Sequence, residues 1–260
     1  MIRDSLAKFP RRPTIFFPNN EVMRVINSRD FINLYSDTIN QLGLSGVALL
    51  TLRNSRVRQL NQIIRREVFH RKNTLELGES LMVTRNNYAW NLIDNYTYLA
   101  NGDIIQCDAV GDQSNLGNFS FLDCQISGFG PTRERYSDYG KLVLNPYTHH
   151  YQPLTSKQRN ELYRWVVPRY KHLMEPDRLN AIASDPFLHC LDSYYAYAFT
   201  VHKSQESQFH DFYLDLSDWE WYLSQHPEAA LRWLYTAVTR ATNRLFHIYG
   251  VDKNDLSLAV

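Results

Sequence analysis

The stretch that decides the fold lies near the carboxyl terminus and reads Ala196-Tyr197-Ala198-Phe199-Thr200-Val201-His202-Lys203-Ser204-Gln205. Its first half is aromatic and small, which is typical of a buried strand. Its second half is abruptly polar, with hydroxyl, imidazole, ammonium and amide groups in near succession. A strand that ends in this way predicts anion-binding side chains and backbone N–H groups gathered at one place. An ordinary loop after a core strand is the alternative interpretation.

A second stretch further along the chain makes the anion-binding interpretation stronger. It reads Leu234-Tyr235-Thr236-Ala237-Val238-Thr239-Arg240-Ala241 and continues an apolar helix face that begins at Leu231. Pro227 and Glu228 are the residue types that open a helix. Arg240 stands off the apolar face near the helix end, and a short strand (residues 212–216) separates the two stretches.

In this order the two stretches resemble motifs V and VI of superfamily 1 helicases, which usually read T-V-H-K-S-Q-G-S and L-Y-T-A-[LV]-T-R-A. The most similar branch is the RecD/Dda/Pif1-like group, whose members translocate 5′ to 3′ on single-stranded DNA. One position departs from the pattern, because Glu206 stands where the family has glycine. A carboxylate there would repel a γ-phosphate, and a tight turn that favours glycine would be reshaped.

Composition sets limits on the class of protein. With 260 residues, 44% hydrophobic and 21% charged, the chain can bury a core as one large domain or two small ones. A net charge of +1 gives no global field for nucleic acid, so such binding must come from local patches. The three cysteines lack the spacing of a zinc site or a disulfide framework. With no signal peptide and no long apolar run, we expect a cytoplasmic chain that has no membrane partner.

A strand and a basic helix are expected earlier in the chain. Residues 46–52 are nearly all apolar, which is typical of a buried parallel strand, and a helix is expected over 55–69. The segment from the end of this strand to residue 72 contains one acid, Glu67, against these basic residues: Arg53, Arg56, Arg58, Arg65, Arg66, Arg71 and Lys72. A phosphate-facing surface and a solvated helix face explain this surplus equally well.

From residue 77 the pattern changes to short strand candidates separated by turn residues, which predicts a small antiparallel barrel. The turn Asn101-Gly102-Asp103 and the strand candidates 119–127 and 141–144 belong to this segment. The segment also resembles the G-[DE]-x-[LV]-M-V-x-[RK]-N-[DN]-Y … N-G-D pattern that begins an inserted SH3-like barrel in RecD-like helicases. The matching residues are Gly78, Glu79, Leu81, Met82, Val83, Arg85, Asn86, Asn87, Tyr88, Asn101, Gly102 and Asp103.

Strands separated by helices on both sides of this segment predict an α/β fold with a mainly parallel sheet. The resemblance implies that this fold is a RecA-like parallel sheet flanked by helices, with a small antiparallel SH3-like β-barrel inserted in it. We expect residues 1–76 and 151–260 to form the RecA-like second motor domain and residues 77–150 to form the barrel. A helical pattern returns over 156–173, with a break expected at Pro168.

The chain lacks the parts that hold a nucleotide. A phosphoryl-transfer motor needs a phosphate cradle and a carboxylate for Mg²⁺, but the sequence contains no G-x-x-x-x-G-K-[ST] and no apolar strand ending in Asp-Glu. The resemblance places these parts in an N-terminal RecA-like domain, present in cis or, if the gene is split, in trans. We therefore expect ATP and Mg²⁺ to bind only with that domain, and neither to bind this chain alone. An excerpt of a longer protein, a split gene product and a degenerate relative remain open.

Roles for single residues follow from the resemblance and the chemistry together. Arg240 is the candidate arginine finger, because a forked, permanently charged guanidinium stabilises the charge on transferring phosphoryl oxygens. The residues expected beside it at the nucleotide are Gln205, Glu206 and Tyr235. The candidate DNA-binding residues are Arg53, Asn54, Thr200, His202, Lys203 and Ser204. No set of residues has metal-ligand spacing.

Two of these assignments have structural alternatives. Arg240 could instead form a salt bridge at a helix terminus, and Tyr235 could be a core residue. The assignments also require a geometry: we expect Arg240 to lie on the same rim of the sheet as Thr200 and Gln205.

The resemblance predicts the C-terminal half of an ATP-dependent 5′ to 3′ DNA helicase, which supplies the arginine finger and part of the single-stranded DNA groove. The alternative is a non-catalytic module, derived from a helicase, that binds nucleic acid or protein. A weaker third interpretation is a nuclease, based on the carboxylates Asp211, Asp215 and Asp218. Strand ends and a helix cap explain these three residues equally simply.

Overall fold

A computed structural model describes residues 22–25, 28–90, 98–129, 135–148, 153–204 and 209–248. The chain divides into two compact units. Residues 1–71 and 197–260 form the first, here called the sheet unit, and residues 72–196 form the second, the barrel unit. Within the described ranges, no helix has the length and apolar character needed to cross a bilayer.

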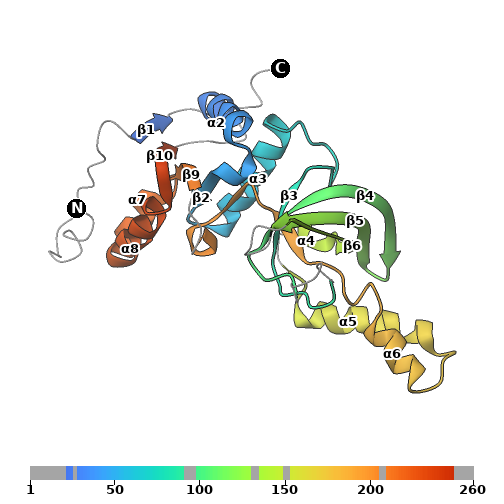
Figure 1. The fold of residues 1–260 in the computed structure, drawn as a ribbon. Helices are drawn as coiled ribbons and strands as arrows, with labels where there is room; N and C mark the ends of the chain where they lie inside the picture. The colour runs from blue at the N-terminus through green and yellow to red at the C-terminus, as the bar shows by residue number, and fades with distance from the viewer. Residues whose placement is uncertain are drawn as a thin grey trace. The chain divides into compact units, whose positions relative to one another are not determined.

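The sheet unit is built on five parallel strands (Figure 1). Their order in the sheet is β1-β10-β9-β2-β8. The bounds are β1 (Val22–Val25), β2 (Val47–Thr51), β8 (Ala198–Thr200), β9 (Phe209–Asp215) and β10 (Ala241–Ile248). Every residue of β2 is buried, as expected for a strand covered on both faces.

Helices cover both faces of this sheet (Figure 1). On one side lie α2 (Ser28–Leu42) and α3 (Asn54–Glu67), and on the other α7 (Trp219–Gln225) and α8 (Pro227–Val238). Short 3₁₀ turns, η1 (Leu44–Gly46) and η3 (Val201–Ser204), complete the connections. Adjacent strands β2 and β9 are thus followed by helices on opposite faces. In open α/β sheets, the crevice at the carboxyl ends of such a strand pair is where ligands bind.

Aromatic rings fasten α2 to the sheet. The ring centroids of Phe31 and Tyr35 lie 5.9 and 5.1 Å from that of Tyr213 on β9. The Tyr213 ring stacks on Phe246 of β10 at 4.6 Å, and its hydroxyl lies 2.7 Å from the Thr38 hydroxyl. This face of the sheet is therefore held by rings and by hydrogen bonds between buried hydroxyl groups.

Asn61 attaches α3 to the sheet through side-chain hydrogen bonds. It is fully buried, and its amide oxygen accepts hydrogen bonds from the backbone N–H groups of Tyr197 and Ala198, both at 2.9 Å. Its amide nitrogen donates to the carbonyl of Ala198 at 2.9 Å. One side chain therefore pairs three backbone groups at the start of β8, the strand with which the deciding stretch begins.

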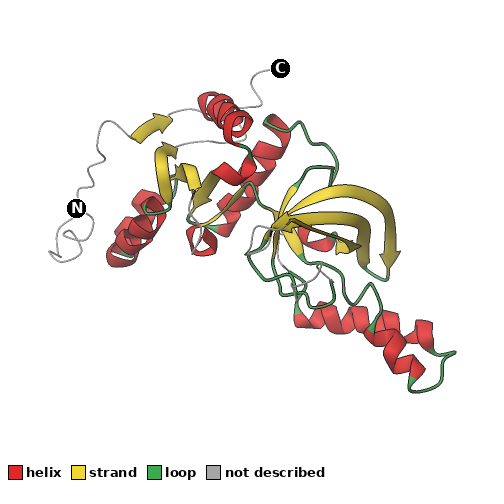
Figure 2. Cartoon of the chain, in the orientation of Figure 1, coloured by secondary structure: helices red, strands yellow, loops and turns green. Residues whose placement is uncertain are grey.

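The barrel unit contains an antiparallel sheet in the order β6-β5-β4-β3-β7 (Figure 2). Its strands are β3 (Ser80–Val83), β4 (Ile104–Leu116), β5 (Phe119–Phe129), β6 (Arg135–Val143) and β7 (Ser193–Tyr195). The N–H of Leu191, just before β7, donates to Lys141 of β6 at 2.8 Å, and its carbonyl accepts from Val143 at 3.1 Å. These bonds join the two ends of the sheet, so the strands close on themselves.

Helices α4 (Asn145–Thr148), α5 (Ser156–Val166) and α6 (Asp177–Ala183) also belong to the barrel unit, with η2 (Val167–Tyr170) following α5. Thr155 and Gln158 form a capping box at the start of α5. The α helix ends directly before Pro168, at the predicted break. Leu162 and Val166 of α5 pack into one core cluster with the barrel residues Phe119 and Phe121.

This packing moves the domain boundary away from the predicted position. The sequence pattern assigns residues 151–260 to the domain with the parallel sheet, whereas the compact units change over between Ala196 and Tyr197. The physical reason is that α5 buries its apolar face on barrel strand β5, and that β7 pairs with β3. A helical pattern shows that a face must be buried but does not show against which partner.

The predicted fold class is confirmed: a parallel sheet flanked by helices, with a small barrel-like antiparallel insertion. Individual barrel strands differ from their predicted bounds. β6 begins at Arg135, although only residues 141–144 were expected in this strand, and β4 over Ile104–Leu116 was not among the strand candidates. The outer half of β4 is largely exposed and polar, so it lacks the alternation that marks a strand.

Candidate functional site

The strand register places the predicted site residues at two opposite edges of the parallel sheet. Thr200, at the end of β8, pairs with Thr51 at the end of β2, so both lie at the carboxyl edge. Arg240 precedes β10, and its carbonyl accepts from the N–H of Phe209 at 2.9 Å, at the amino edge. β9 runs from Phe209 to Asp215, and at about 3.3 Å per residue it separates the edges by roughly 20 Å.

The expectation that Arg240 and Thr200 share one rim is therefore wrong. The reason is the direction of α8, which leaves the carboxyl edge after β9 and α7 and returns across the sheet to start β10 at the amino edge. A parallel connection of this kind always returns the chain to the opposite edge. Gln205 and Glu206 lie outside the described residues, as does the side chain of Ser204.

The deciding stretch itself leads from one edge to the other. Thr200 ends β8 at the carboxyl edge, η3 follows and lies next to α8, and β9 starts with Phe209 at the amino edge. The residues between η3 and β9, which include Gln205 and Glu206, must connect these two positions. Sequence neighbours within one motif thus serve different edges of the sheet.

At the carboxyl edge, Arg53 and Trp221 form an exposed pair. The guanidinium of Arg53 lies 4.0 Å from the centroid of the Trp221 ring, and its Nε is 3.3 Å from a carboxylate oxygen of Asp218. Half of Trp221 is exposed (50%), and Asn54 beside Arg53 is exposed as well. A guanidinium next to an open indole face combines a phosphate ligand with a stacking surface for a base.

Sequence reasoning missed Trp221. The sequence analysis assigned no role to the segment Trp219-Glu220-Trp221, whose two indole rings have different partners. Trp219 stacks on Trp233 of α8 with 6.1 Å between ring centroids, whereas Trp221 stays at the surface. The available signal was a second tryptophan at a position that a short amphipathic helix does not bury.

Next to this pair, Arg56 is engaged in a buried network. Its Nε lies 2.7 Å from Asp215, a carboxylate that is 2% exposed at the end of β9. The hydroxyl groups of Thr51 and Ser217 donate to the same carboxylate at 3.0 and 2.6 Å. Arg56 therefore stabilises the carboxyl edge and has little freedom to bind an external phosphate.

The basic surplus of α3 is consequently smaller than its sequence suggests. Arg53 pairs with Asp218, Arg56 with Asp215 and Arg66 with Glu67. Two of these carboxylates, at the end of β9 and just after it, lie far away in sequence, so the count between residues 53 and 72 could not include them. Ion pairs within the chain thus occupy three of these basic residues, which favours a largely solvated helix face.

The same pairs explain the three aspartates behind the nuclease interpretation. Asp215 and Asp218 pair with Arg56 and Arg53, and Asp211 pairs with Arg244. In the part of the chain that the structure describes, no group of three His, Cys, Asp or Glu side chains is placed to hold a metal ion. These carboxylates are therefore accounted for as internal ion-pair partners.

The polar half of the deciding stretch is exposed unevenly. Thr200 is buried, with 9% of its surface exposed, so its side chain contributes little outer surface to the carboxyl edge. His202 is exposed, and Lys203 is partly buried. Burial lowers the pKa of the Lys203 ammonium group, because it disfavours the charged form. A phosphate that approached Lys203 would counter this effect, because a nearby negative charge favours the charged form.

At the amino edge, Arg240 is partly exposed and is held by local contacts. Its Nε donates to the carbonyl of Thr236 at 3.2 Å, and Nη2 donates to the hydroxyl of Thr239 at 3.4 Å. Among the described residues it has no carboxylate partner, so the salt-bridge alternative finds no support there. Tyr235 is 45% exposed, which argues against the core alternative for this residue.

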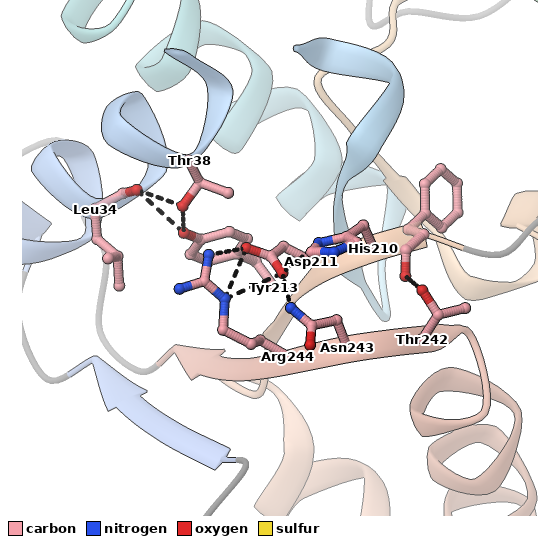
Figure 3. A network of polar contacts seen from close by, with 9 residues as sticks. Leu34, Thr38, His210, Asp211, Tyr213, Thr242, Asn243 and Arg244 are labelled. Carbon is pink, nitrogen blue, oxygen red and sulfur yellow. Dashed lines mark hydrogen bonds and ion pairs between the residues drawn. The ribbon is translucent and has the colours of Figure 1, made fainter. Parts of the chain in front are cut away.

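The buried carboxylate of Asp211 on β9 forms an ion pair with Arg244 of β10, whose side chain is 40% exposed (Figure 3). The Arg244 Nε lies 3.1 and 3.0 Å from the two oxygens of Asp211, and Asn243 and His210 add further contacts. Burial opposes ionisation of Asp211, but hydrogen bonds and charge from Arg244 outweigh it and hold the pKa of the carboxyl below its usual range. The same pair raises the pKa of Arg244.

This pair predicts part of the acid sensitivity of the sheet unit. Because the pKa of Asp211 is lower in the folded state, its stabilising contribution is present above the unfolded value of about 3.9 and is lost as pH falls through the folded value. We expect Asp211→Asn to lower stability at neutral pH and to reduce the further loss on acidification. Urea unfolding midpoints measured from neutral to acidic pH test this. Glu220→Gln, at an exposed carboxylate of the same unit, should follow the unmodified chain.

Comparison with known proteins matches residues 195–248 to one family, described as the UvrD-like helicase C-terminal domain. This segment runs from the end of β7 to the end of β10 and includes both edges described above. Comparison with curated proteins gave no match. A solved structure, the Pif1 helicase from Candida albicans, aligns with 98% of this chain at 10% identity and a TM-score of 0.27. The chain spans about half the length of that protein, since the alignment covers 50% of it.

Proposed function

Because residues 195–248 match the UvrD-like helicase C-terminal domain family, we propose that the chain is the C-terminal motor half of an ATP-dependent DNA helicase. In this proposal it translocates 5′ to 3′ on single-stranded DNA, as RecD- and Pif1-like helicases do. The antiparallel unit inserted between α3 and β8 supports that branch, since an inserted barrel was expected after this part of the chain, although the unit extends to residue 196.

The family match over residues 195–248 is the observation that carries the proposal, whereas the candidate residues lie at two edges of the sheet and not on the one rim that the assignments required. The carboxyl edge presents Arg53, Trp221 and His202, which suit a strand of nucleotides. The amino edge presents Arg240 with no carboxylate partner among the described residues, which suits a phosphoryl group.

The residues present fit only part of an ATP site. Arg240 can stabilise negative charge on a terminal phosphate, whereas the phosphate-cradle motif and the Mg²⁺ carboxylates are absent from the sequence. An N-terminal RecA-like domain, in cis or in trans, would supply these parts. In the proposal this chain binds single-stranded DNA without hydrolysing ATP by itself, and it completes the site when the partner domain is present.

A non-catalytic binding module is the second candidate, and Glu206 is the observation that favours it. A carboxylate in place of the usual glycine would oppose a γ-phosphate by charge repulsion. Under this alternative the carboxyl edge keeps its affinity for DNA, while the addition of an intact N-terminal motor domain restores no ATP turnover.

The experiment is a titration of the isolated chain with fluorescent oligothymidylate at increasing salt. We expect binding that weakens steeply with salt, since phosphate contacts release counterions. Trp221→Ala should weaken it about fivefold or more, because stacking of one base contributes on the order of 1 kcal/mol or more. Tyr163→Ala, at an exposed ring on α5 of the other unit, serves as the matched control. A flat salt response, or equal binding by the two variants, would contradict the proposed groove.

A further inference from the structure

At the carboxyl edge of the parallel sheet, two side chains from the segment after β9 hold the guanidinium of Arg53. Its Cζ lies 4.0 Å from the centroid of the Trp221 ring, and its Nε lies 3.3 Å from a carboxylate oxygen of Asp218. In the described part of the chain, neither Nη atom has a hydrogen-bond partner. A phosphate that approaches this edge can therefore bind Arg53, but it has to share the guanidinium with Asp218.

The fold itself gives no structural reason for a carboxylate beside Arg53. The side chains of Arg53 and Asp218 are 41% and 26% exposed, and ion pairs at such exposure contribute little to stability. Asp218 is the N-cap residue of α7, but its side chain makes no capping hydrogen bond. The start of α3 is tied to the end of β9 by another pair, Arg56 with the buried carboxylate of Asp215.

Backbone hydrogen bonds fix the positions of both partners. Arg53 is the N-cap residue of α3, and its carbonyl accepts the first helical hydrogen bond from the N–H of Val57 at 3.0 Å. The N–H of Trp219, next to Asp218, donates to the carbonyl of Leu216 at 3.0 Å. The carboxylate and the guanidinium thus meet on backbone that is already held in place, which is the preorganisation that a functional pair needs.

A carboxylate in this position weakens the binding of a phosphate in two ways. It cancels part of the positive charge of Arg53, and it lies next to Nε, one of the N–H groups that a phosphate can bind in a bidentate arrangement. When the phosphate leaves, Asp218 remains as a partner for the guanidinium. The free state is therefore stabilised relative to the bound state, and a strand that moves over this edge is released more readily.

We propose that Asp218 competes with the phosphates of single-stranded DNA for Arg53, and that it sets the affinity and the salt dependence of binding at the carboxyl edge. This inference rests on the proposed binding of single-stranded DNA at this edge. Asp218 presents to the guanidinium what a phosphodiester presents, an oxygen atom that carries negative charge. Removal of its charge should therefore strengthen binding, whereas removal of a residue that only supports the site would weaken binding.

The test compares Asp218→Asn with Glu220→Gln in titrations of fluorescent oligothymidylate at increasing salt. Asparagine is as good an N-cap residue as aspartate, so the start of α7 is preserved. We expect Asp218→Asn to bind about two- to fivefold more tightly at low salt, in keeping with the modest strength of exposed ion pairs. Its affinity should also fall more steeply with salt, because an uncompensated guanidinium releases more counterions.

Glu220→Gln removes an equal charge from an exposed position of α7 and should bind nearly as the unmodified chain does. Asp218→Ser, another good N-cap residue, repeats the test, and thermal unfolding verifies that each variant is folded. A double-mutant cycle then identifies the route of the effect. In the Arg53→Gln background, Asp218→Asn should leave the affinity nearly unchanged, because the guanidinium for which it competes is absent.

Three results would overturn the competition between Asp218 and phosphate. They are unchanged or weaker binding by both Asp218 variants, an equal gain in Glu220→Gln, and a gain that persists in the Arg53→Gln background, which would indicate direct repulsion between Asp218 and the strand. The unmodified chain separates these results from a failure of the proposed function. If it binds oligothymidylate with the expected salt dependence, only the role of Asp218 is lost, whereas absence of such binding overturns the proposed groove as well.

Discussion

Replacement of Arg240 by alanine should reduce ATP turnover by the complete motor about a thousandfold or more and leave its folding intact. A guanidinium that reaches the transferring phosphoryl group contributes about 10³ to 10⁵ to the rate in phosphoryl-transfer enzymes. Arg240 lies partly exposed at the amino edge, where its side chain donates hydrogen bonds to Thr236 and Thr239 of its own segment. Its removal therefore costs little stability, while the charge on the phosphoryl oxygens loses its partner.

Two further variants make this result specific. Arg240→Lys keeps the charge but loses the fork, and we expect it to recover only a small part of the activity. Arg232→Ala removes an exposed arginine from the same helix, where it pairs with Glu228, and should turn over ATP normally. The measurement is steady-state ATP hydrolysis with saturating single-stranded DNA, beside thermal unfolding of each variant. Near-normal turnover by the alanine variant would remove the arginine-finger assignment.

Asn61→Leu should destabilise the sheet unit by about 3 kcal/mol or more, although leucine is similar in size and apolar. The Asn61 side chain pairs three buried backbone groups of Tyr197 and Ala198, and leucine can pair none of them. Each buried polar group left without a partner costs about 1 to 3 kcal/mol. The loss should be concentrated at the start of β8, upstream of the polar half of the deciding stretch.

Urea unfolding measures the total effect, and hydrogen exchange locates it. We expect the amides of Tyr197 and Ala198 to lose more protection than amides elsewhere in the sheet. Asn40→Ala, at an exposed position on α2, is the matched control and should change stability by less than about 0.5 kcal/mol. Unchanged stability in the leucine variant would show that other groups already satisfy this backbone.

The fold could be predicted as far as its determinants are local. The apolar run of β2, the opening of α8 at Pro227 and the turn at Gly102, with a φ of 106°, all follow from short-range chemistry. Ion pairs between distant segments could not be predicted in this way. Arg53 and Arg56 pair with carboxylates at the end of β9 and just after it, so the apparent basic surface of α3 is partly neutralised.

In the candidate site, too, the local features could be predicted from the sequence and the long-range arrangement could not. Which residues carry suitable chemistry was visible in the sequence, and Arg240 is indeed accessible, but the edge of the sheet on which each residue lies was not. That depends on the course of the chain from Thr200 to Phe209 and on the path of α8 across the sheet. Trp221 was missed because a single exposed ring leaves no periodic pattern.

The barrel unit leaves and re-enters the sheet unit at neighbouring points. Phe69, just after α3, lies with its ring 4.9 Å from that of Tyr197, at the start of the returning chain. An insertion whose two ends meet in this way can be exchanged, enlarged or reduced to a short loop without disturbing the strand register beneath it. The barrel unit therefore meets the geometric condition for an insertion that can change in sequence and size while the strand register of the parallel sheet stays the same.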